Sequence, residues 1–216
     1  MKRFLPFAII AAVLLGALVG GYLFYQSKNK TQTAVMPLPA PGGGLPPREK
    51  TPGVITLEEY GDYQCPPCGR LFPILKTIKE EYGDRIKFVF HHFPLIQLHP
   101  HALAAAQAAV AAGFQGRFWE MHNLIYQNQT TWSSAADAKP YFIEYARQAG
   151  VDVSKFLNDI GSTRTNAVIS ADLQSGQARG VNSTPTVFID GREIPYKDLT
   201  LDNLRQEIRN RLEGGG

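Results

Sequence analysis

The sequence predicts an α/β domain that contains a helical insertion and is preceded by one N-terminal transmembrane helix. Residues 54–60, 85–91 and 186–189 have the β-branched, aromatic or alternating composition of strands. Between the second and third of these, apolar residues recur at helical spacing over about 99–178. Ahead of the first strand, residues 4–25 carry no charge over a length that can cross a bilayer.

The N-terminal segment predicts a membrane anchor over residues 1–25. A cleaved signal peptide is the alternative, but its apolar region is usually shorter and is followed by a small-x-small cleavage site. Here the uncharged run is long and ends in the bulky residues of 22–25, which suit a membrane interface. We therefore expect a single-pass protein that is retained in the cytoplasmic membrane.

Residues 26–52 have the composition of a linker. They contain six prolines and the consecutive glycines of 42–44, with almost no periodic apolar positions. As a coil, such a segment spans about 30 Å, and proline extends it further. We place the folded domain that it tethers at residues 53–213.

The charge distribution excludes one class of partner. The chain has a net charge of +3, and residues 1–50 carry most of the basic excess. The folded domain is therefore close to neutral and lacks the basic patches of nucleic-acid-binding proteins. We expect no nucleic-acid partner.

The chain has two cysteines, Cys65 and Cys68, at the junction between the first strand and the next helix. A C-x-x-C pair has three interpretations: half of a metal site, a structural crosslink, or a redox-active dithiol. A zinc site needs two more ligands, and no second C-x-x-C is present. A crosslink across so short a loop would restrict the unfolded chain little. The dithiol is favoured, because a helix N-terminus stabilises an anion such as a thiolate.

Four histidines lie at or after the second strand: His91, His92, His99 and His101. Such a cluster could suggest a metal site. Pro94 and Pro100 interrupt any regular ligand geometry, so turn-capping and surface histidines are the favoured interpretation.

The helical insertion is predicted from several patterns. The run 102–112 contains eight alanines, which favour a helix and let neighbouring helices approach closely. The aromatic and methionine group of 118–125 is more typical of a core than of a binding surface. Three further helices are predicted over 140–149, 153–160 and 166–178.

The C-terminal part predicts a hairpin and a helix. Asp190-Gly191 is a turn signal between the strand 186–189 and residues 192–194. Leucine and isoleucine then share one face of a helix over about 201–212, with Thr200 as its cap.

Four stretches, in this order, resemble motifs of the DsbA-like branch of the thioredoxin superfamily: 59–68, 90–95, 118–122 and 180–186. The resemblance runs from about Gly53 to Leu212. It implies a thioredoxin-like fold in which a helical subdomain is inserted at about 99–178 and borders a substrate groove.

The resemblance also implies a function, a protein disulfide oxidoreductase that exchanges a Cys65–Cys68 disulfide with cysteines of substrate proteins. Cys65 would be the nucleophile and Cys68 the resolving thiol. A cis bond between Thr184 and Pro185 would bring that loop against the dithiol, where the Thr184 backbone would pair with an extended substrate.

Glu59 lies six residues before Cys65, where thioredoxin-like domains have a buried acid. Adjacent strand residues point to opposite faces, so we expect only one of Glu58 and Glu59 to point inward. Two solvated glutamates are one interpretation. The other gives Glu59 a buried role in proton transfer from Cys68.

Partners and direction follow from the same resemblance. No cofactor is implied, a membrane redox partner would reset the dithiol, and a monomer is expected. A catalyst of disulfide formation has little use in a reducing cytosol, so the domain should lie outside the cytoplasmic membrane. Oxidation of substrates is the favoured direction, although Pro67 replaces the histidine that most DsbA-like proteins have there.

Two other functions stay open. The same fold could act as a disulfide reductase or isomerase, which the missing histidine favours. A copper-binding thiol chaperone belongs to a different class, but such domains usually have three residues between the cysteines and a histidine ligand. Here two residues, both proline, separate Cys65 from Cys68.

Overall fold

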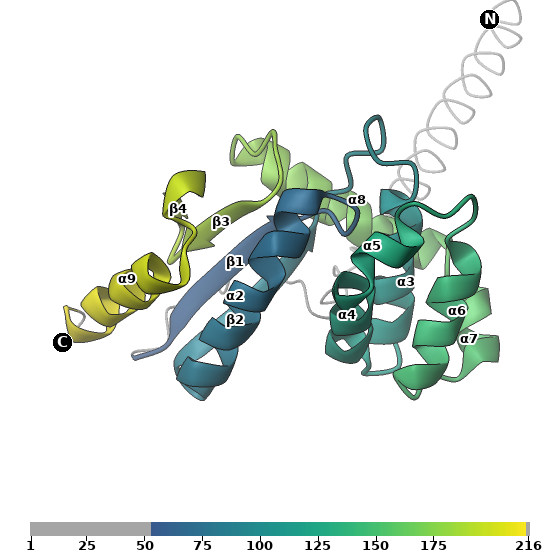
Figure 1. The fold of residues 1–216 in the computed structure, drawn as a ribbon, viewed down its shortest axis with the longest axis horizontal. Coiled ribbons are helices and arrows are strands. Elements are labelled where there is room, and N and C mark those ends of the chain that lie inside the picture. The colour runs from purple at the N-terminus through teal and green to yellow at the C-terminus, as the bar shows by residue number, and fades with distance from the viewer. Residues whose placement is uncertain (1–52, 215–216) are drawn as a thin grey trace, which may run out of the picture. The chain divides into compact units, whose positions relative to one another are not determined.

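A computed structural model of the chain describes residues 53–214 (Figure 1). The predicted anchor and linker, residues 1–25 and 26–52, lie outside this range. None of the helices between residues 53 and 214 combines the length and hydrophobicity that a bilayer-spanning helix needs.

The described domain is built on a four-stranded sheet with the order β2-β1-β3-β4. The central strand β1 pairs in parallel with β2 and antiparallel with β3, and β3 forms an antiparallel hairpin with β4. The strands are β1 (Ile55–Gly61), β2 (Ile86–His92), β3 (Thr186–Ile189) and β4 (Arg192–Ile194). The two N-terminal strands that the sequence predicts are confirmed, each displaced by one residue.

Helices α2 (Pro66–Tyr82) and α9 (Leu201–Glu213) cover one face of the sheet, the nearer face in Figure 1. Side chains at alternate positions of β1 point to this face, because strand residues two apart share a side. They join the apolar faces of both helices in one buried cluster that includes Ile55, Leu57, Leu75, Ile78, Val187, Ile189, Leu204 and Ile208.

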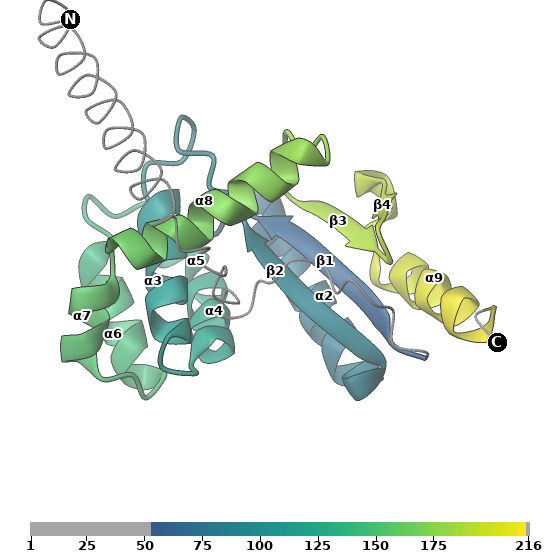
Figure 2. The same cartoon turned by 180° about the vertical axis from the view of Figure 1, so that it is seen from behind.

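Helix α8 (Thr163–Ala178) lies across the opposite face of the sheet, as Figure 2 shows from behind. The other side chains of β1 and β3 meet it there, with Tyr60 and Phe188 at the centre of a small cluster. A glycine permits the close approach. A Cβ added at Gly176 would lie 2.8 Å from the Phe93 ring and 3.0 Å from that of Tyr60.

The helical insertion lies between β2 and β3 in the chain. It contains α3 (Ala102–Gly113), α4 (Phe118–Gln127), α5 (Gln129–Trp132), α6 (Lys139–Gln148) and α7 (Val153–Asp159), and α8 completes it. The small side chains of α3 are buried among aromatic residues of α4 and α6. The predicted helices are confirmed, with two differences. The short α5 was not predicted, and α8 begins at Thr163 rather than residue 166, because the Ser162 side chain caps it by accepting from Thr165 N.

Three local predictions in the C-terminal part are confirmed. The peptide bond between Thr184 and Pro185 is cis. Asp190 and Gly191 both have positive φ, 50° and 81°, as a two-residue hairpin turn requires. The Thr200 side chain accepts a hydrogen bond from Asn203 N and caps α9.

The expectation that only one of the two adjacent acids points inward is wrong. Glu58 and Glu59 do point to opposite faces of β1, yet each is only 1% exposed. The reason is that α8 covers the second face. Because the sheet has helices on both sides, neither side of β1 reaches solvent.

The interpretation of His91 and His92 as surface or turn-capping residues is also wrong. Both are buried, at 1% and 0% exposure. His91 lies between two carboxylates, with Nδ1 3.0 Å from Asp172 Oδ1 and Nε2 3.3 Å from Glu58 Oε2. Arg179 donates to the same Glu58 oxygen at 2.8 Å, so the histidine belongs to a buried charge network under α8.

Candidate active site

The dithiol is positioned by the start of α2. Cys65 is the N-cap of this helix, with extended backbone angles, and Pro66 and Pro67 occupy its first turn. Proline suits that position, since the first helical N–H groups have no partner within the helix. Cys65 N donates to Asp62 O at 3.1 Å, and Cys65 O accepts from Gly69 N at 3.1 Å. The thiol at position 65 therefore lies at the positive end of the helix.

The two thiols differ in acidity. A hydrogen bond from the Cys68 thiol, helped by the Thr184 side chain, lowers the pKa of Cys65 to about 6, although burial opposes this. Burial and the neighbouring Cys65 hold the pKa of Cys68 well above its ordinary value. Near neutral pH the reduced site therefore carries its negative charge on Cys65. Cys65 is 4% exposed and Cys68 is fully buried, so the more acidic thiol is also the one that solvent reaches.

The loop before β3 meets the dithiol, as the sequence predicts. The Cys65 thiol donates to the carbonyl oxygen of Thr184 at 3.3 Å. Thr184 Oγ1 is buried and has no hydrogen-bond partner among the described residues. Its hydroxyl is thus free to donate to a Cys65 thiolate. The structure brings Cys65, Cys68 and the Thr184-Pro185 bond together at one point.

Glu59 lies under α2, on the same side of β1 as the dithiol helix, and its predicted burial is confirmed. Burial, together with charge repulsion from a Cys65 thiolate, raises the pKa of Glu59 to about 8. The negative charge of Glu59 in turn raises the pKa of Cys68. The acid is therefore neutral at pH 7, and its ionisation is coupled to the state of the dithiol.

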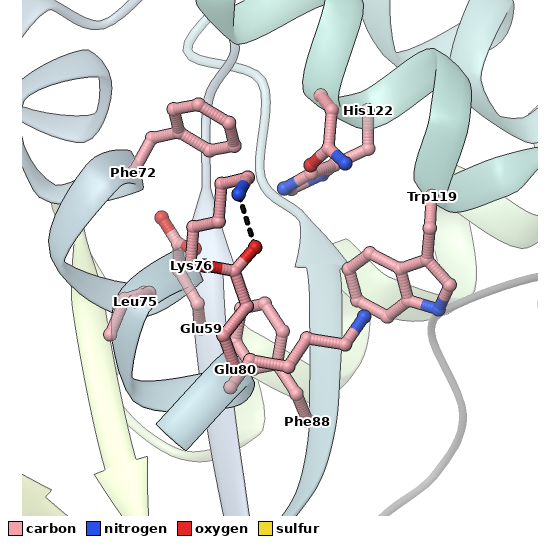
Figure 3. Close-up of a pocket in the computed structure, with 10 residues that line it drawn as sticks. Glu59, Phe72, Leu75, Lys76, Glu80, Phe88, Trp119 and His122 are labelled. Atoms are coloured by element: carbon pink, nitrogen blue, oxygen red, sulfur yellow. Dashed lines mark hydrogen bonds and ion pairs between the residues drawn. The ribbon is translucent and has the colours of Figure 1, made fainter. Parts of the chain in front are cut away.

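A cavity of about 220 Å³ adjoins Glu59 (Figure 3). Glu59 Oε1 is buried without a hydrogen-bond partner among the described residues, and its side chain forms part of the cavity wall. The remaining wall combines aromatic and charged side chains, namely Phe72, Leu75, Lys76, Lys79, Glu80, Phe88, Trp119, His122 and Asn123. The Glu59 carboxyl group is otherwise enclosed by protein. The cavity is a neighbouring space that can hold water.

Sequence analysis missed the contact between the insertion and the dithiol helix. Gln129 Nε2, in α5, donates to Tyr63 O at 2.7 Å and to Cys65 O at 2.8 Å. A Cβ at Gly69 would lie 2.1 Å from Gln129 Oε1, so a larger residue there would displace the Gln129 amide from these carbonyls. The glycine directly after the C-x-x-C motif was the available signal, because it marks a close approach.

Among residues 53–214, no group of three or more His, Cys, Asp or Glu side chains is arranged to hold a metal ion. His122, which shares the cavity wall, is instead bound to Tyr63. Its Nδ1 lies 3.0 Å from the Tyr63 hydroxyl, and burial holds the pKa of His122 well below its ordinary value. This histidine is thus a neutral member of the aromatic core.

A protein-family model described as "Thioredoxin" matches residues 49–210, which is most of the chain. The chain belongs to this family. The matched range includes the C-x-x-C motif, the cis-proline loop and the whole helical insertion of this thioredoxin family member.

Solved structures with the same fold include thiol–disulfide exchange proteins. BdbD from Bacillus subtilis, in its oxidised form, aligns with a TM-score of 0.66 and 20% identity over 76% of this chain and 91% of that one. The thiol-disulfide exchange protein α-DsbA2 from Wolbachia pipientis aligns with a TM-score of 0.63 and 19% identity over 85% and 92%. These likenesses show a DsbA-like arrangement of the thioredoxin fold.

The relatives found by sequence are named as antiporters, not as oxidoreductases. The Na⁺/H⁺ antiporter NhaA 1 of Mycolicibacterium gilvum is 38% identical over 142 residues, which cover 64% of this chain but only 22% of the relative. The chain thus corresponds to about a fifth of the length of that relative. The likeness concerns one part of the antiporter.

Proposed function

We propose that this protein is a membrane-tethered thiol–disulfide oxidoreductase that oxidises cysteine pairs in proteins outside the cytoplasm. The observation that carries the proposal is the unequal acidity of two thiols one helical turn apart. Cys65, at the helix start, has a pKa of about 6, whereas burial keeps Cys68 protonated. Thiol–disulfide exchange needs such an asymmetry, since a thiolate both attacks and leaves more readily than a thiol.

Oxidation proceeds in two exchanges. A substrate thiolate attacks Cys65 Sγ of the Cys65–Cys68 disulfide, which forms a mixed disulfide and releases Cys68 as a thiolate. A second substrate thiolate then attacks the substrate sulfur of the mixed disulfide and releases the Cys65 thiolate. The substrate loses two electrons and two protons, and the cysteine pair gains two electrons. A membrane redox partner accepts these electrons and restores the disulfide.

Glu59 supplies the proton that the buried Cys68 needs. A thiolate at Cys68 is costly because the side chain is fully buried. Glu59 is neutral at pH 7, with a pKa of about 8, so it can donate a proton as that thiolate forms. In the reverse direction the Glu59 carboxylate accepts a proton from Cys68. The cavity beside Glu59 offers a path to solvent for resetting its proton.

Thr184 orients the substrate. Its carbonyl oxygen accepts from the Cys65 thiol in the reduced site. In the disulfide form this thiol has no hydrogen, so the carbonyl becomes available to an N–H of an extended substrate chain. An interaction of this kind places a substrate sulfur next to Cys65 and depends on the substrate backbone, not on its other side chains.

A reductase or isomerase is a second candidate, favoured by one specific observation. The Cys65 pKa of about 6 lies between the values of about 7 for thioredoxin, a reductant, and about 3.5 for DsbA, a strong oxidant. Pro67 contributes no charge that would lower it further. The reduction potential, which is about −270 mV for thioredoxin and about −120 mV for DsbA, therefore decides the direction.

The deciding experiment is the reduction potential of the full chain in glutathione buffers, followed by mass-shift labelling of free thiols. A potential above about −180 mV, together with oxidation of a reduced unfolded protein, supports the oxidase. A value near −270 mV would make the protein a reductase. Stoichiometric copper bound to Cys65 and Cys68 in the purified protein would contradict both the oxidase and the reductase, and would identify a copper-binding thiol chaperone.

A Cys68→Ala variant tests the roles of the two thiols. Without the resolving thiol, Cys65 should stay attached to substrates, which form high-mass species that disappear on reduction. A Cys65→Ala variant is the matched control and should trap at least tenfold less, since burial keeps Cys68 protonated and inaccessible. Equal trapping by both variants would contradict the assignment.

Tethering is tested separately. Residues 1–25 should remain on the mature protein and keep it in the membrane fraction after a carbonate wash. The relatives named as antiporters work in membranes, which supports a position of this domain next to a bilayer. A soluble form that lacks residues 1–25 would identify the segment as a cleaved signal. Accessibility of the domain to an added protease in spheroplasts, but not in intact inverted vesicles, would place it outside the cytoplasm.

A further inference from the structure

The loop between β2 and α3 is bound to the turn that precedes Cys65. Leu95 N donates to Asp62 Oδ2 at 2.9 Å, and His99 Nδ1 lies 2.7 Å from the same oxygen. His101 N donates to Gln64 Oε1 at 2.6 Å. Three contacts thus join residues 95–101 to the two polar side chains immediately before the dithiol.

Asp62 is the centre of this arrangement. Its side chain is 1% exposed, and Oδ1 accepts from Gln64 N at 2.8 Å, while its carbonyl oxygen accepts from Cys65 N. Its negative charge raises the pKa of Cys65. The residue that shapes the turn therefore works against the helix N-terminus, which favours the Cys65 thiolate.

His99 is suited to offset that charge. Its ring donates to Asp62 through Nδ1, and its side chain is 19% exposed. When protonated it carries a positive charge next to the Asp62 carboxylate, whereas Pro67, inside the motif, carries none. His99 contacts Asp62 directly, and Asp62 affects the pKa of Cys65, Cys68 and Tyr126.

We propose that His99 is a positioning residue of the dithiol, which holds Asp62 in the turn and cancels its charge beside the Cys65 thiolate. The loop histidine thereby sets the nucleophilicity of Cys65 from outside the C-x-x-C motif. This role of His99 depends on the proposed exchange reaction, because that reaction requires a nucleophilic Cys65. Its test, however, measures the ionisation of Cys65 directly, and so can fail while the exchange activity stands.

Three variants separate charge from hydrogen bonding. His99→Gln keeps a donor for Asp62 but has no cationic form. Asp62→Asn removes the negative charge and keeps one of the two acceptor oxygens, which can still serve Leu95 N and residue 99. The double variant is neutral at both positions. His101→Gln is the matched control, because the His101 ring contacts Ala135 O, not Asp62. The reduced full chain is alkylated with iodoacetamide between pH 4 and 9, and modification of Cys65 is followed by mass spectrometry.

The expected shifts have opposite signs. His99→Gln should raise the apparent pKa of Cys65 by about half a unit, which slows alkylation at pH 5 about threefold. Asp62→Asn should lower this pKa by a similar amount, and the double variant should return close to the wild type. His101→Gln should leave the profile unchanged.

A purely structural role for His99 gives a different result. An unchanged profile in a folded His99→Gln variant, or shifts of the same sign in both single variants, would overturn the proposal. If His99→Gln does not fold, His99→Arg serves instead, since it keeps a donor and carries a permanent positive charge. That variant should keep the apparent Cys65 pKa at or below the wild-type value, and a higher pKa would equally overturn the proposal.

Discussion

Glu58 and Glu59 are adjacent, equally buried and opposite in environment. Glu58, on the α8 side of β1, accepts hydrogen bonds from His91 and Arg179, which lower its pKa although burial opposes them. Glu59, on the α2 side, has an oxygen without a partner among the described residues, and burial raises its pKa to about 8. One face of the strand keeps its acid ionised within a network, and the other keeps its acid neutral.

The difference between the environments of the two acids points to a structural role for one and a chemical role for the other. A buried carboxylate with charged partners holds elements together, here β1, β2 and α8. A buried carboxyl without partners costs stability and is therefore expected at a site where its proton is used. By this criterion we propose Glu59 as the functional acid, whereas the contacts of Glu58 make it part of the scaffold.

The largest effect is expected on the Glu58 side. His91→Ala removes the group that lies between Glu58 and Asp172 and leaves two buried carboxylates without this partner. We expect a loss of about 4 kcal/mol in the free energy of unfolding, measured by urea denaturation. Glu144→Ala, which removes exposed contacts with Arg147 and Gln148, is the control and should change this value by less than about 0.5 kcal/mol.

The pH dependence of that loss has a defined sign. Hydrogen bonds raise the pKa of His91 although burial opposes this, so its stabilisation is complete below 6.5 and disappears as the pH rises through its folded value. The pKa of Glu58 is lowered, so its stabilisation is complete above 4.5 and disappears on acidification. The difference between wild type and His91→Ala should therefore be greatest between about pH 4.5 and 6.5. A constant difference from pH 4 to 9 would argue against the charge network.

On the other face, Glu59→Gln should stabilise the protein. The folded state holds the Glu59 proton up to about pH 8, whereas the unfolded chain releases it near 4.5, so stability falls as the pH rises between these values. Glutamine removes this fall, which amounts to about 3 kcal/mol at pH 7. The two proteins should be equally stable at pH 4. The same variant should slow the exchange steps that protonate or deprotonate Cys68, and a faster or unchanged rate would remove Glu59 from the mechanism.

The smallest effect is expected for Arg179→Gln. This arginine donates to Glu58 and lies 3.7 Å above the centre of the Phe188 ring, but it is partly exposed. Glutamine can still donate to Glu58, so we expect a loss of about 1 kcal/mol, smaller at high salt. The exchange kinetics should not change. A slower exchange in this variant would show that the two faces of β1 are coupled.

The features of this fold that depend on local sequence patterns could be predicted from the sequence. Strand alternation, the helix after Cys65, the Asp190-Gly191 turn and the Thr200 cap each depend on residues close together in the chain. The position of Cys65 at the helix start follows in the same way.

The remaining features depend on contacts between distant residues. Burial of Glu58 and His91 requires Asp172 and Arg179 of the α8 region, more than 80 residues from His91, and no local pattern indicates which face of the sheet that helix covers. The contact between His99 and Asp62 likewise depends on how a proline-bounded loop folds back.

The amide of Gln129 makes the helical insertion part of the catalytic turn. It is bonded to the carbonyl of Cys65 from a helix of only four residues, and a Cβ at the adjacent Gly69 would displace it. The insertion is therefore no independent module. A chimera that takes the insertion of another family member should preserve the geometry at Cys65 only if that insertion also brings an amide such as that of Gln129 against Gly69.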